Sequence, residues 1–306
     1  MKPEQVEFFS DNERVSGWFF AASSYPGPAV VFCPGFTGTK FAKFYEPYVE
    51  FFVNAGISVL MFDYRGWGES EGHRGQISPL KQVEDVRNAL SYLETRDEVD
   101  QGRRCLLGFS FGGGVAAYTA AVDSRVRCCV SISPVVDGED WLRGMRSADE
   151  WEALLVRLSE NRLRRVVGEP EAFVSNTKEI MISGEERARA VGIKGEIPAA
   201  LVPTESPLKS AEEIIEFAPL SRAREASEGG LLLFAVEDDQ IVPAEHARKL
   251  AAASSGSAEL ILLSGGGHYD AYLRHFDTIS SEILKFLRNR LGLPAVDNES
   301  EATCTS

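Results

Sequence analysis

Short, mostly apolar runs recur along the chain and alternate with stretches in which apolar residues are spaced three and four apart. The runs are typical of strands buried on both faces of a parallel sheet, whereas the second spacing marks amphipathic helices. The strand-like runs cover residues 29–33, 57–62, 103–109, 127–132, 231–236 and 259–263. The helical spacing covers residues 44–55, 79–96, 111–122, 243–253 and 278–291. This alternation predicts an α/β fold with a mostly parallel, doubly wound sheet and right-handed crossovers.

Turn and capping residues mark the ends of several predicted elements. Residues 5–10 and 15–20 flank Asp11-Asn12-Glu13, which predicts an N-terminal hairpin. Ser78 and Pro79 suit the N-cap and the first position of the helix that follows them.

The alternation stops between the sixth and seventh strands, counting the hairpin. From Val136 to about Glu228 the chain has helical spacing and no strand-like run. Three capping boxes of the form Ser-x-x-Glu begin at Ser147, Ser183 and Ser210. We interpret residues 137–225 as a helical cap inserted into an α/β core of residues 1–136 and 226–293. A second independent domain is the alternative, but long insertions more often serve as lids. The larger apolar side chains of this segment are expected to be buried: Trp141, Met145, Trp151, Phe173, Met181 and Phe217.

Composition and charge exclude several classes of partner. The chain has 32 basic and 46 acidic residues, a formal net charge of −14, which disfavours nucleic acid and anionic membranes as partners.

No apolar signal core and no apolar run of about 18 residues occurs, so a cytoplasmic location is expected. The polar residues 294–306 are predicted to be disordered. Cys33, Cys105, Cys128 and Cys129 lie in apolar runs, and we expect buried thiols.

The sequence Gly108-Phe109-Ser110-Phe111-Gly112 stands between a predicted strand and a predicted helix. The pattern G-x-S-x-G in this context is typical of a nucleophile elbow, in which a strained turn exposes the serine hydroxyl. Side chains at the two glycines would collide with neighbouring backbone. We therefore predict that Ser110 is the nucleophile.

Serine needs a neighbouring base, and the chain has four histidines. His268 follows the last strand in a Gly-rich turn, so it should lie at the sheet edge that also carries Ser110. His73 lies in a loop. His246 and His275 lie on helical stretches, where solvated or half-buried side chains are expected.

An acid should orient the base, and three carboxylates follow the strand at 231–236. Asp239 is the preferred candidate because it directly precedes the helix start at Val242-Pro243. Asp238 and Glu237 remain alternatives. Asp63 also follows a strand, but it precedes Ser110 in the chain and is expected to organise its own turn.

Acyl transfer also needs two donors for the developing oxyanion. The backbone N–H of Phe111, which follows the nucleophile, should be one of them. The N–H of Phe36, in the loop Pro34-Gly35-Phe36-Thr37, should be the other.

Taken in order, these motifs together resemble the α/β-hydrolase superfamily. The resemblance covers about residues 1–136 and 226–291, and its motifs are Pro34-Gly35-Phe36, Asp63-Tyr64-Arg65-Gly66-Trp67-Gly68-Glu69-Ser70, Gly108-Phe109-Ser110-Phe111-Gly112, Asp239-Gln240-Ile241-Val242-Pro243 and Gly267-His268. Residues 33–40 and 78–85 look like the dienelactone-hydrolase-like branch and its microbial thiohydrolase and polyketide-transferase relatives. Cys33 departs from the His that many members carry there. A serine nucleophile argues against the reactions of true dienelactone hydrolases, dehalogenases and epoxide hydrolases.

The resulting hypothesis is a serine hydrolase that cleaves a carboxylic ester through an acyl-enzyme on Ser110. No metal or cofactor is implied, and the expected partner is a small or medium, partly apolar acyl substrate. A homodimer is an open possibility. A thioester hydrolase, an acyltransferase and an amide or lactam hydrolase are alternatives with the same residues, and a non-enzymatic binding protein is a further alternative. Four arginines of the cap could pair with a substrate carboxylate, but a solvated helix face is expected: Arg157, Arg162, Arg164 and Arg165.

Overall fold

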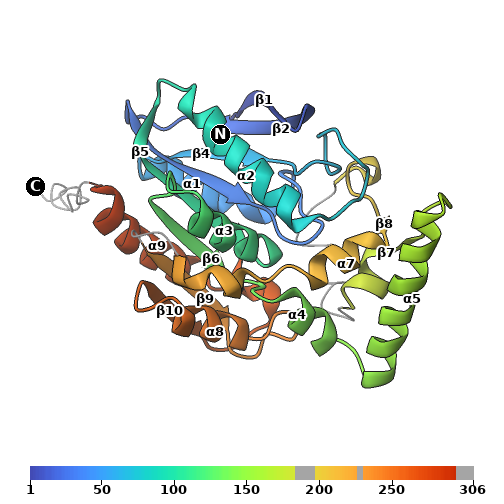
Figure 1. Cartoon of the computed structure of the whole chain (residues 1–306). Coiled ribbons are helices and arrows are strands. Elements are labelled where there is room, and N and C mark those ends of the chain that lie inside the picture. Colours follow the sequence, from blue (N-terminus) through green and yellow to red (C-terminus); the bar gives the residue numbers. More distant parts are fainter. Residues whose placement is uncertain (183–196, 226–229, 294–306) are drawn as a thin grey trace, which may run out of the picture.

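A computed structural model describes residues 1–182, 197–225 and 230–293. Its main feature is an eight-stranded sheet of order β1-β2-β4-β3-β5-β6-β9-β10 (Figure 1). Strand β2 pairs antiparallel with β1 on one side and with β4 on the other, and every other neighbouring pair is parallel. The strands are β1 (Glu4–Ser10), β2 (Glu13–Phe20), β3 (Gly27–Cys33), β4 (Ser58–Phe62), β5 (Val99–Phe109), β6 (Cys128–Ile132), β9 (Leu231–Val236) and β10 (Ala258–Leu263).

Helices cover both faces of this sheet, because its inner strands are apolar on both sides and must be shielded from water. One core cluster joins the sheet to α2 (Pro79–Glu94) and α3 (Phe111–Val122). The other joins it to α1 (Glu46–Asn54) and α9 (Phe276–Leu291). Helix α8 (Glu245–Ala253) packs on β10 and β9. The predicted doubly wound α/β fold is confirmed.

The ends of the elements differ from the prediction by a few residues. The hairpin turns at Asp11 and Asn12, both with positive φ (49° and 62°), as small polar residues permit. Strand β5 begins at Val99, ahead of the predicted start at Arg103. The four cysteines expected in the interior are buried free thiols.

Among its described residues, the segment between β6 and β9 contains three α-helices and two short strands, besides shorter helical turns. These are α4 (Gly138–Gly144), α5 (Ala148–Val166), α7 (Lys209–Ile215), β7 (Phe173–Ser175) and β8 (Glu205–Pro207). The expectation of no strand here is wrong, because β7 and β8 pair antiparallel over only three residues each, too few to produce an alternating pattern. Figure 1 shows the segment gathered at one end of the sheet. The division of the chain into a core and a cap stays a prediction.

The expected capping boxes of this segment have different outcomes. Ser147 forms a complete box with Glu150 at the start of α5. Ser210 lies inside α7, where its hydroxyl accepts a hydrogen bond from the N–H of Ile77 (2.9 Å), so the expected box there is wrong. The box at Ser183 falls outside the described residues. Phe173, the first residue of β7, is 48% exposed, contrary to the expectation of burial.

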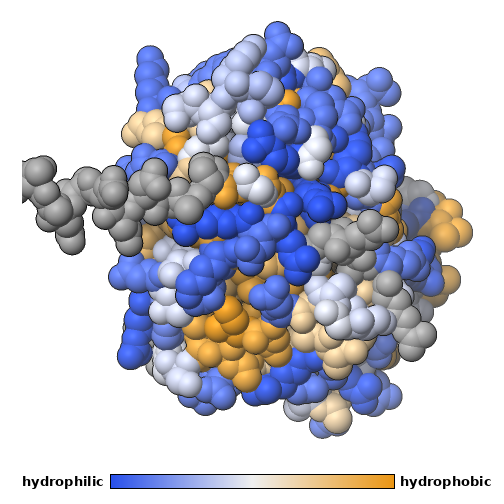
Figure 2. Space-filling view, turned by 90° about the vertical axis from the view of Figure 1, so that its left-hand side faces the viewer, coloured by the Kyte–Doolittle hydropathy of each residue, from blue (hydrophilic) through white to orange (hydrophobic). Residues whose placement is uncertain are grey.

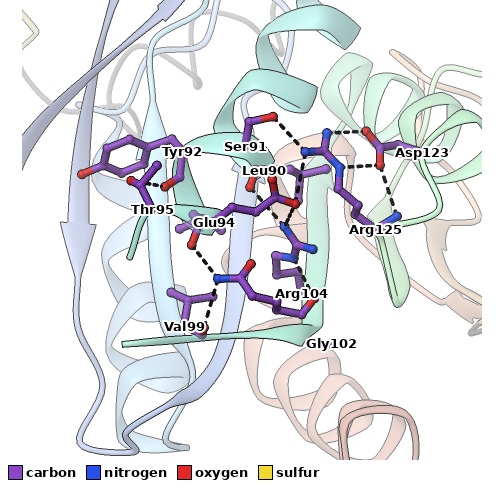
Figure 3. A network of polar contacts seen from close by, with 12 residues as sticks. Leu90, Ser91, Tyr92, Glu94, Thr95, Val99, Gly102, Arg104, Asp123 and Arg125 are labelled. Carbon is purple, nitrogen blue, oxygen red and sulfur yellow. Dashed lines mark hydrogen bonds and ion pairs between the residues drawn. The ribbon is translucent and has the colours of Figure 1, made fainter. Parts of the chain in front are cut away.

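A polar network ties β5, the strand that precedes Ser110, to α2 and α3 (Figure 3). The guanidinium of Arg104 in β5 is buried and donates to Glu94 at the end of α2 (2.9 Å). The same carboxylate lies 3.4 Å from Arg125, which also donates to Asp123 (2.7 Å) after α3. Burial raises the pKa of Asp123, but hydrogen bonds from Arg125 outweigh this and lower it to about 2. The ion pairs therefore hold the three elements together at neutral pH.

No helix in the described ranges is long and apolar enough to cross a bilayer. Figure 2 shows the face opposite the inserted segment, where polar residues cover most of the surface and one apolar area lies in the lower half. Single apolar areas of this kind are common on folded proteins.

We expect Asp123→Asn to lower the free energy of unfolding by about 1–2 kcal/mol at pH 7, because the charged partner of Arg125 is lost. An unfolded Asp titrates near about 3.9, whereas the pKa of folded Asp123 is about 2. The stabilisation is therefore complete above about pH 5 and is lost as the pH falls toward about 2. Urea unfolding at pH 7, 4 and 3 measures this.

The control is Glu282→Gln, which removes an exposed pair with Lys285 on α9 and should change stability by about 0.5 kcal/mol or less. A difference between Asp123→Asn and the parent protein that does not shrink with falling pH would contradict the prediction.

Candidate active site

Ser110 occupies the turn between β5 and α3 in a strained conformation, with φ 54° and ψ −123°. The turn is compressed because backbone lies directly against backbone on both sides of it. A Cβ at Gly108 would stand 2.3 Å from the carbonyl oxygen of Gly112, and a Cβ at Gly112 would stand 2.2 Å from the carbonyl oxygens of Cys33 and Pro34. Only glycine fits at these two positions, so the sequence pattern follows from the close approach.

The side chains of Ser110, His268 and Asp239 form one continuous chain of hydrogen bonds. His268 Nε2 lies 2.9 Å from Ser110 Oγ, and His268 Nδ1 lies 2.7 Å from Asp239 Oδ2. All three residues are buried. Because the carboxylate accepts the Nδ1–H, Nε2 carries the free lone pair and faces the serine hydroxyl. The structure thus brings together the three side chains that the sequence analysis selected from distant segments.

Asp239 is held by its own loop. Its second oxygen, Oδ1, accepts the backbone N–H groups of Ile241 and Val242, each at 2.8 Å. The two alternative carboxylates, Glu237 and Asp238, are exposed, and Glu237 accepts from Ser264 Oγ (2.5 Å). Of the three candidates, Asp239 is the one that contacts His268.

Asp63 lies at the end of β4 and organises its own turn, as expected. Its carboxylate accepts from the Lys40 ammonium (2.5 Å) and from the backbone N–H groups of Lys40 (2.8 Å) and Glu69 (3.0 Å). Burial raises the pKa of Asp63, and the Lys40 charge works against that shift.

The other three histidines lie away from Ser110. His73 is exposed in its loop. His275 donates from Nε2 to the carbonyl oxygen of Gly265 (2.8 Å) and so supports the turn that carries His268. His246 is 3% exposed, so the expectation of a solvated or half-buried side chain is wrong. Its Nδ1 accepts the N–H of Val136, which joins α8 to the start of the inserted segment.

The two backbone donors proposed for an oxyanion flank the serine. Phe111 is the first residue of α3, and Phe36 lies in the loop after β3. Within the described residues, neither N–H donates to a backbone carbonyl. The two rings meet edge to face at 6.1 Å and both contact Trp141 of α4.

The model of the alpha/beta hydrolase fold family matches residues 28–274 of the chain. The chain belongs to the α/β-hydrolase family. This hydrolase is 30% identical over 278 residues to a thiohydrolase of Eupenicillium brefeldianum, covering 87% of each chain. It is 25% identical over 290 residues to a polyketide transferase of a Penicillium species, covering 94% of this chain and 96% of that one. The solved structure of the α/β hydrolase GrgF from Penicillium sp. sh18 superimposes with a TM-score of 0.83 at 24% identity, covering 95% of this chain and 100% of that one.

The structure adds residues to this hydrolase's site that the sequence analysis missed. The hydroxyl of Tyr272 lies 3.1 Å from His268 Nε2. Its position four residues after His268, one helical turn on, was a usable signal. Trp141 donates its indole N–H to the carbonyl oxygen of Ile241 (2.9 Å), which braces the Asp239 loop from α4. Met181, one of the apolar side chains expected to be buried, reaches the cavity from the inserted segment.

The cavity beside Ser110 is small, with a volume of about 30 Å³. Its walls are mostly apolar and aromatic, and they include Phe44, Tyr45, Met181 and Ile241. A larger cavity of about 430 Å³ lies beyond Tyr45, between α1 and β2, and contains none of the three hydrogen-bonded side chains. The convergence of polar groups, rather than cavity size, identifies the candidate active site.

The four arginines of α5 are engaged within the inserted segment. Arg162 and Arg165 both pair with Glu212 of α7, Arg157 pairs with Glu179 (2.9 Å), and Arg164 pairs with Glu169 (2.9 Å). These pairs join parts of the segment to one another. In the described residues no group of three or more His, Cys, Asp or Glu side chains is placed to hold a metal ion.

We expect Gly112→Ala to destabilise the hydrolase by several kcal/mol, on the order of 3 or more, because its methyl group would collide with rigid backbone of β3. Gly144→Ala is the matched control, since a Cβ there meets nothing within 4 Å. Thermal unfolding of both variants measures the difference. A Gly112→Ala protein as stable as Gly144→Ala would show that the backbone contact is not rigid.

Proposed function

We propose that this hydrolase cleaves a carboxylic ester through an acyl-enzyme formed on Ser110. The observation that carries the proposal is the unbroken hydrogen-bond chain from Asp239 through His268 to Ser110, at 2.7 and 2.9 Å. A serine hydroxyl is a weak nucleophile unless a base takes its proton, and this arrangement supplies the base and fixes its tautomer.

In the first half of the reaction, Ser110 Oγ attacks the ester carbonyl carbon as His268 Nε2 takes the hydroxyl proton. Asp239 stabilises the imidazolium that results. The C–O bond to the alcohol then breaks, and the proton on Nε2 passes to the leaving oxygen. In the second half, His268 Nε2 removes a proton from water, whose oxygen attacks the acyl carbon. The bond from that carbon to Ser110 Oγ then breaks, and the Nε2 proton returns to Oγ.

The oxyanion of each tetrahedral intermediate would be bound by the N–H groups of Phe36 and Phe111. Both are without a backbone partner in the described residues. The N–H of Phe111 also stands at the N-terminus of α3, where the helix dipole favours negative charge. The Cβ position at Gly35 is 3.0 Å from the carbonyl oxygen of Phe109, so the Phe36 loop is pressed against the serine turn.

The walls of the cavity support a small or medium, partly apolar acyl or alcohol group. Phe36 and Phe44 on the core side and Met181 from the inserted segment all line it. The arginines of α5 are already paired with carboxylates of the same segment, so a substrate carboxylate gains no support from them.

A thioester donor, with water or another acyl acceptor, is the second candidate function. It is favoured by the relatives that align over most of the chain, which are described as a thiohydrolase and a polyketide transferase. The three side chains would act in the same way, because a thioester differs only in its leaving group. An amide is a less suitable substrate, since its amine leaving group must be fully protonated.

Replacing the proposed nucleophile should abolish turnover. We expect Ser110→Ala and His268→Ala to reduce kcat by about 10⁴-fold or more. Asp239→Asn should reduce it by about 10³- to 10⁴-fold. The amide oxygen would stay on the N–H groups of Ile241 and Val242, so the amide NH₂ would face Nδ1 and favour the wrong tautomer. The initial rate on p-nitrophenyl butyrate measures these losses.

Asp238→Asn is the matched control for the acid, since Asp238 is exposed and one residue away. It should retain the parental rate. Full activity in Asp239→Asn with loss in Asp238→Asn would reverse the assignment, and full activity in Ser110→Ala would overturn the mechanism.

A matched substrate panel should separate the candidate functions. We expect a butyryl ester to have a higher kcat/KM than the butyryl amide, in which the same acyl group is bonded to nitrogen. A butyryl thioester turned over more than about tenfold faster than an oxygen ester of equal leaving-group pKa would favour the second candidate. Added alcohol or thiol that diverts the acyl group from water would identify a transferase.

A further inference from the structure

The hydroxyl of Tyr272 is placed at the reacting atoms by a rigid aromatic setting. Tyr272 follows the short helical turn His268–Ala271 and is 2% exposed. Its ring stacks on Phe44, with centroids 5.3 Å apart and planes at 20°, and meets the edge of Phe109 at 5.5 Å. This packing leaves the ring little freedom, so the position of the hydroxyl is fixed by the core.

The hydroxyl has a polar neighbour that takes part in the proposed reaction. It lies 3.1 Å from His268 Nε2, which in turn lies 2.9 Å from Ser110 Oγ. Burial raises the pKa of Tyr272 well above its usual value, so it remains a protonated donor wherever the histidine works as a base.

The free lone pair of Nε2 cannot accept two full hydrogen bonds in the resting enzyme. Since Ser110 Oγ–H uses that lone pair, the proton of Tyr272 is not committed to Nε2. When Oγ bonds to the acyl carbon, Nε2 takes the hydroxyl proton and no longer accepts a hydrogen bond. The phenol O–H then lies beside Nε2–H, and its proton is free to form a hydrogen bond. The leaving atom must come close to Nε2 to receive its proton, so it also comes close to the phenol.

We propose that Tyr272 is a further catalytic residue that donates a hydrogen bond to the leaving oxygen and, in the second half of the reaction, to the incoming acceptor. The inference rests on the proposed function. In the step concerned, the bond from the acyl carbon to the leaving oxygen breaks, the Nε2 proton moves to that oxygen, and Tyr272 keeps its own proton throughout. The Tyr272 hydroxyl stabilises the negative charge that develops before the proton arrives.

This role makes a specific prediction about the leaving group. A departing alkoxide is strongly basic and gains much from a second donor, whereas p-nitrophenolate and thiolate leave with little help. Loss of the hydroxyl should therefore slow alkyl esters far more than activated esters or thioesters. A purely structural role for Tyr272 would slow all of them equally.

The test compares Tyr272→Phe with the parent enzyme on ethyl butyrate, phenyl butyrate, p-nitrophenyl butyrate and S-ethyl thiobutyrate. The acyl group is constant, so kcat/KM reports the acylation half-reaction for each leaving group. We expect a loss of about 10- to 100-fold on ethyl butyrate, the size expected for one hydrogen bond to a charged group. The loss should be below about threefold on the p-nitrophenyl ester and the thioester, and turnover of these two also shows that the variant is folded.

Tyr48→Phe is the matched control. Tyr48 is fully buried in the same aromatic cluster, with its ring edge against Phe109 at 5.3 Å, and its hydroxyl has no hydrogen-bond partner among the described residues. It should leave every substrate unaffected.

An equal loss on all four substrates, or no loss on ethyl butyrate, would overturn the role of Tyr272 while leaving the acyl-enzyme mechanism intact. Ser110→Ala is run on the same series to separate the two. Retained turnover in that variant, or no turnover of any substrate by the parent enzyme, would overturn the proposed function and this inference with it.

Discussion

The contact of backbone with backbone around Ser110 is the constraint on which the rest of the site depends. With no side chain at Gly108 or Gly112, the end of β3, the end of β5 and the first turn of α3 meet at van der Waals distance. That contact forces Ser110 into positive φ and turns its hydroxyl out of the turn. It also places the Phe36 loop beside the start of α3, so one steric requirement positions the hydroxyl and both proposed oxyanion donors.

The parallel sheet brings the remaining groups to the same edge. Strands β9 and β10 end beside each other, and the loops that leave them carry Asp239 and His268. Each loop is supported from outside its own strand. Trp141 of the inserted segment holds the Asp239 loop through Ile241, and His275 holds the glycine turn before His268 through Gly265. These two contacts help to keep the histidine within reach of the serine.

The sheet, its helices and the three contacting side chains could be predicted because each follows from a local pattern or from chain order. Buried parallel strands are continuous apolar runs, and the glycine spacing around Ser110 is dictated by sterics. The inserted segment was harder to predict from the sequence. Strands β7 and β8 are too short to show periodicity, and Ser210 matched a capping box although its hydroxyl accepts a hydrogen bond from the N–H of Ile77. His246 and Met181 could not be placed, because their surroundings come from segments distant in the chain.

The arrangement of the site also explains why the substrate is harder to predict than the type of reaction. In the proposed mechanism, the hydrogen-bonded side chains and the backbone donors act on any acyl carbonyl, whatever atom leaves. Discrimination among leaving groups must come from groups that touch the departing atom, and Tyr272 is the polar side chain best placed for that. In the same proposal, competition between water and another acceptor would depend on the apolar side chains that line the cavity of about 30 Å³, among them Met181 and Ile241. A change there would alter the fate of the acyl group and leave the proposed nucleophile, base and acid unchanged.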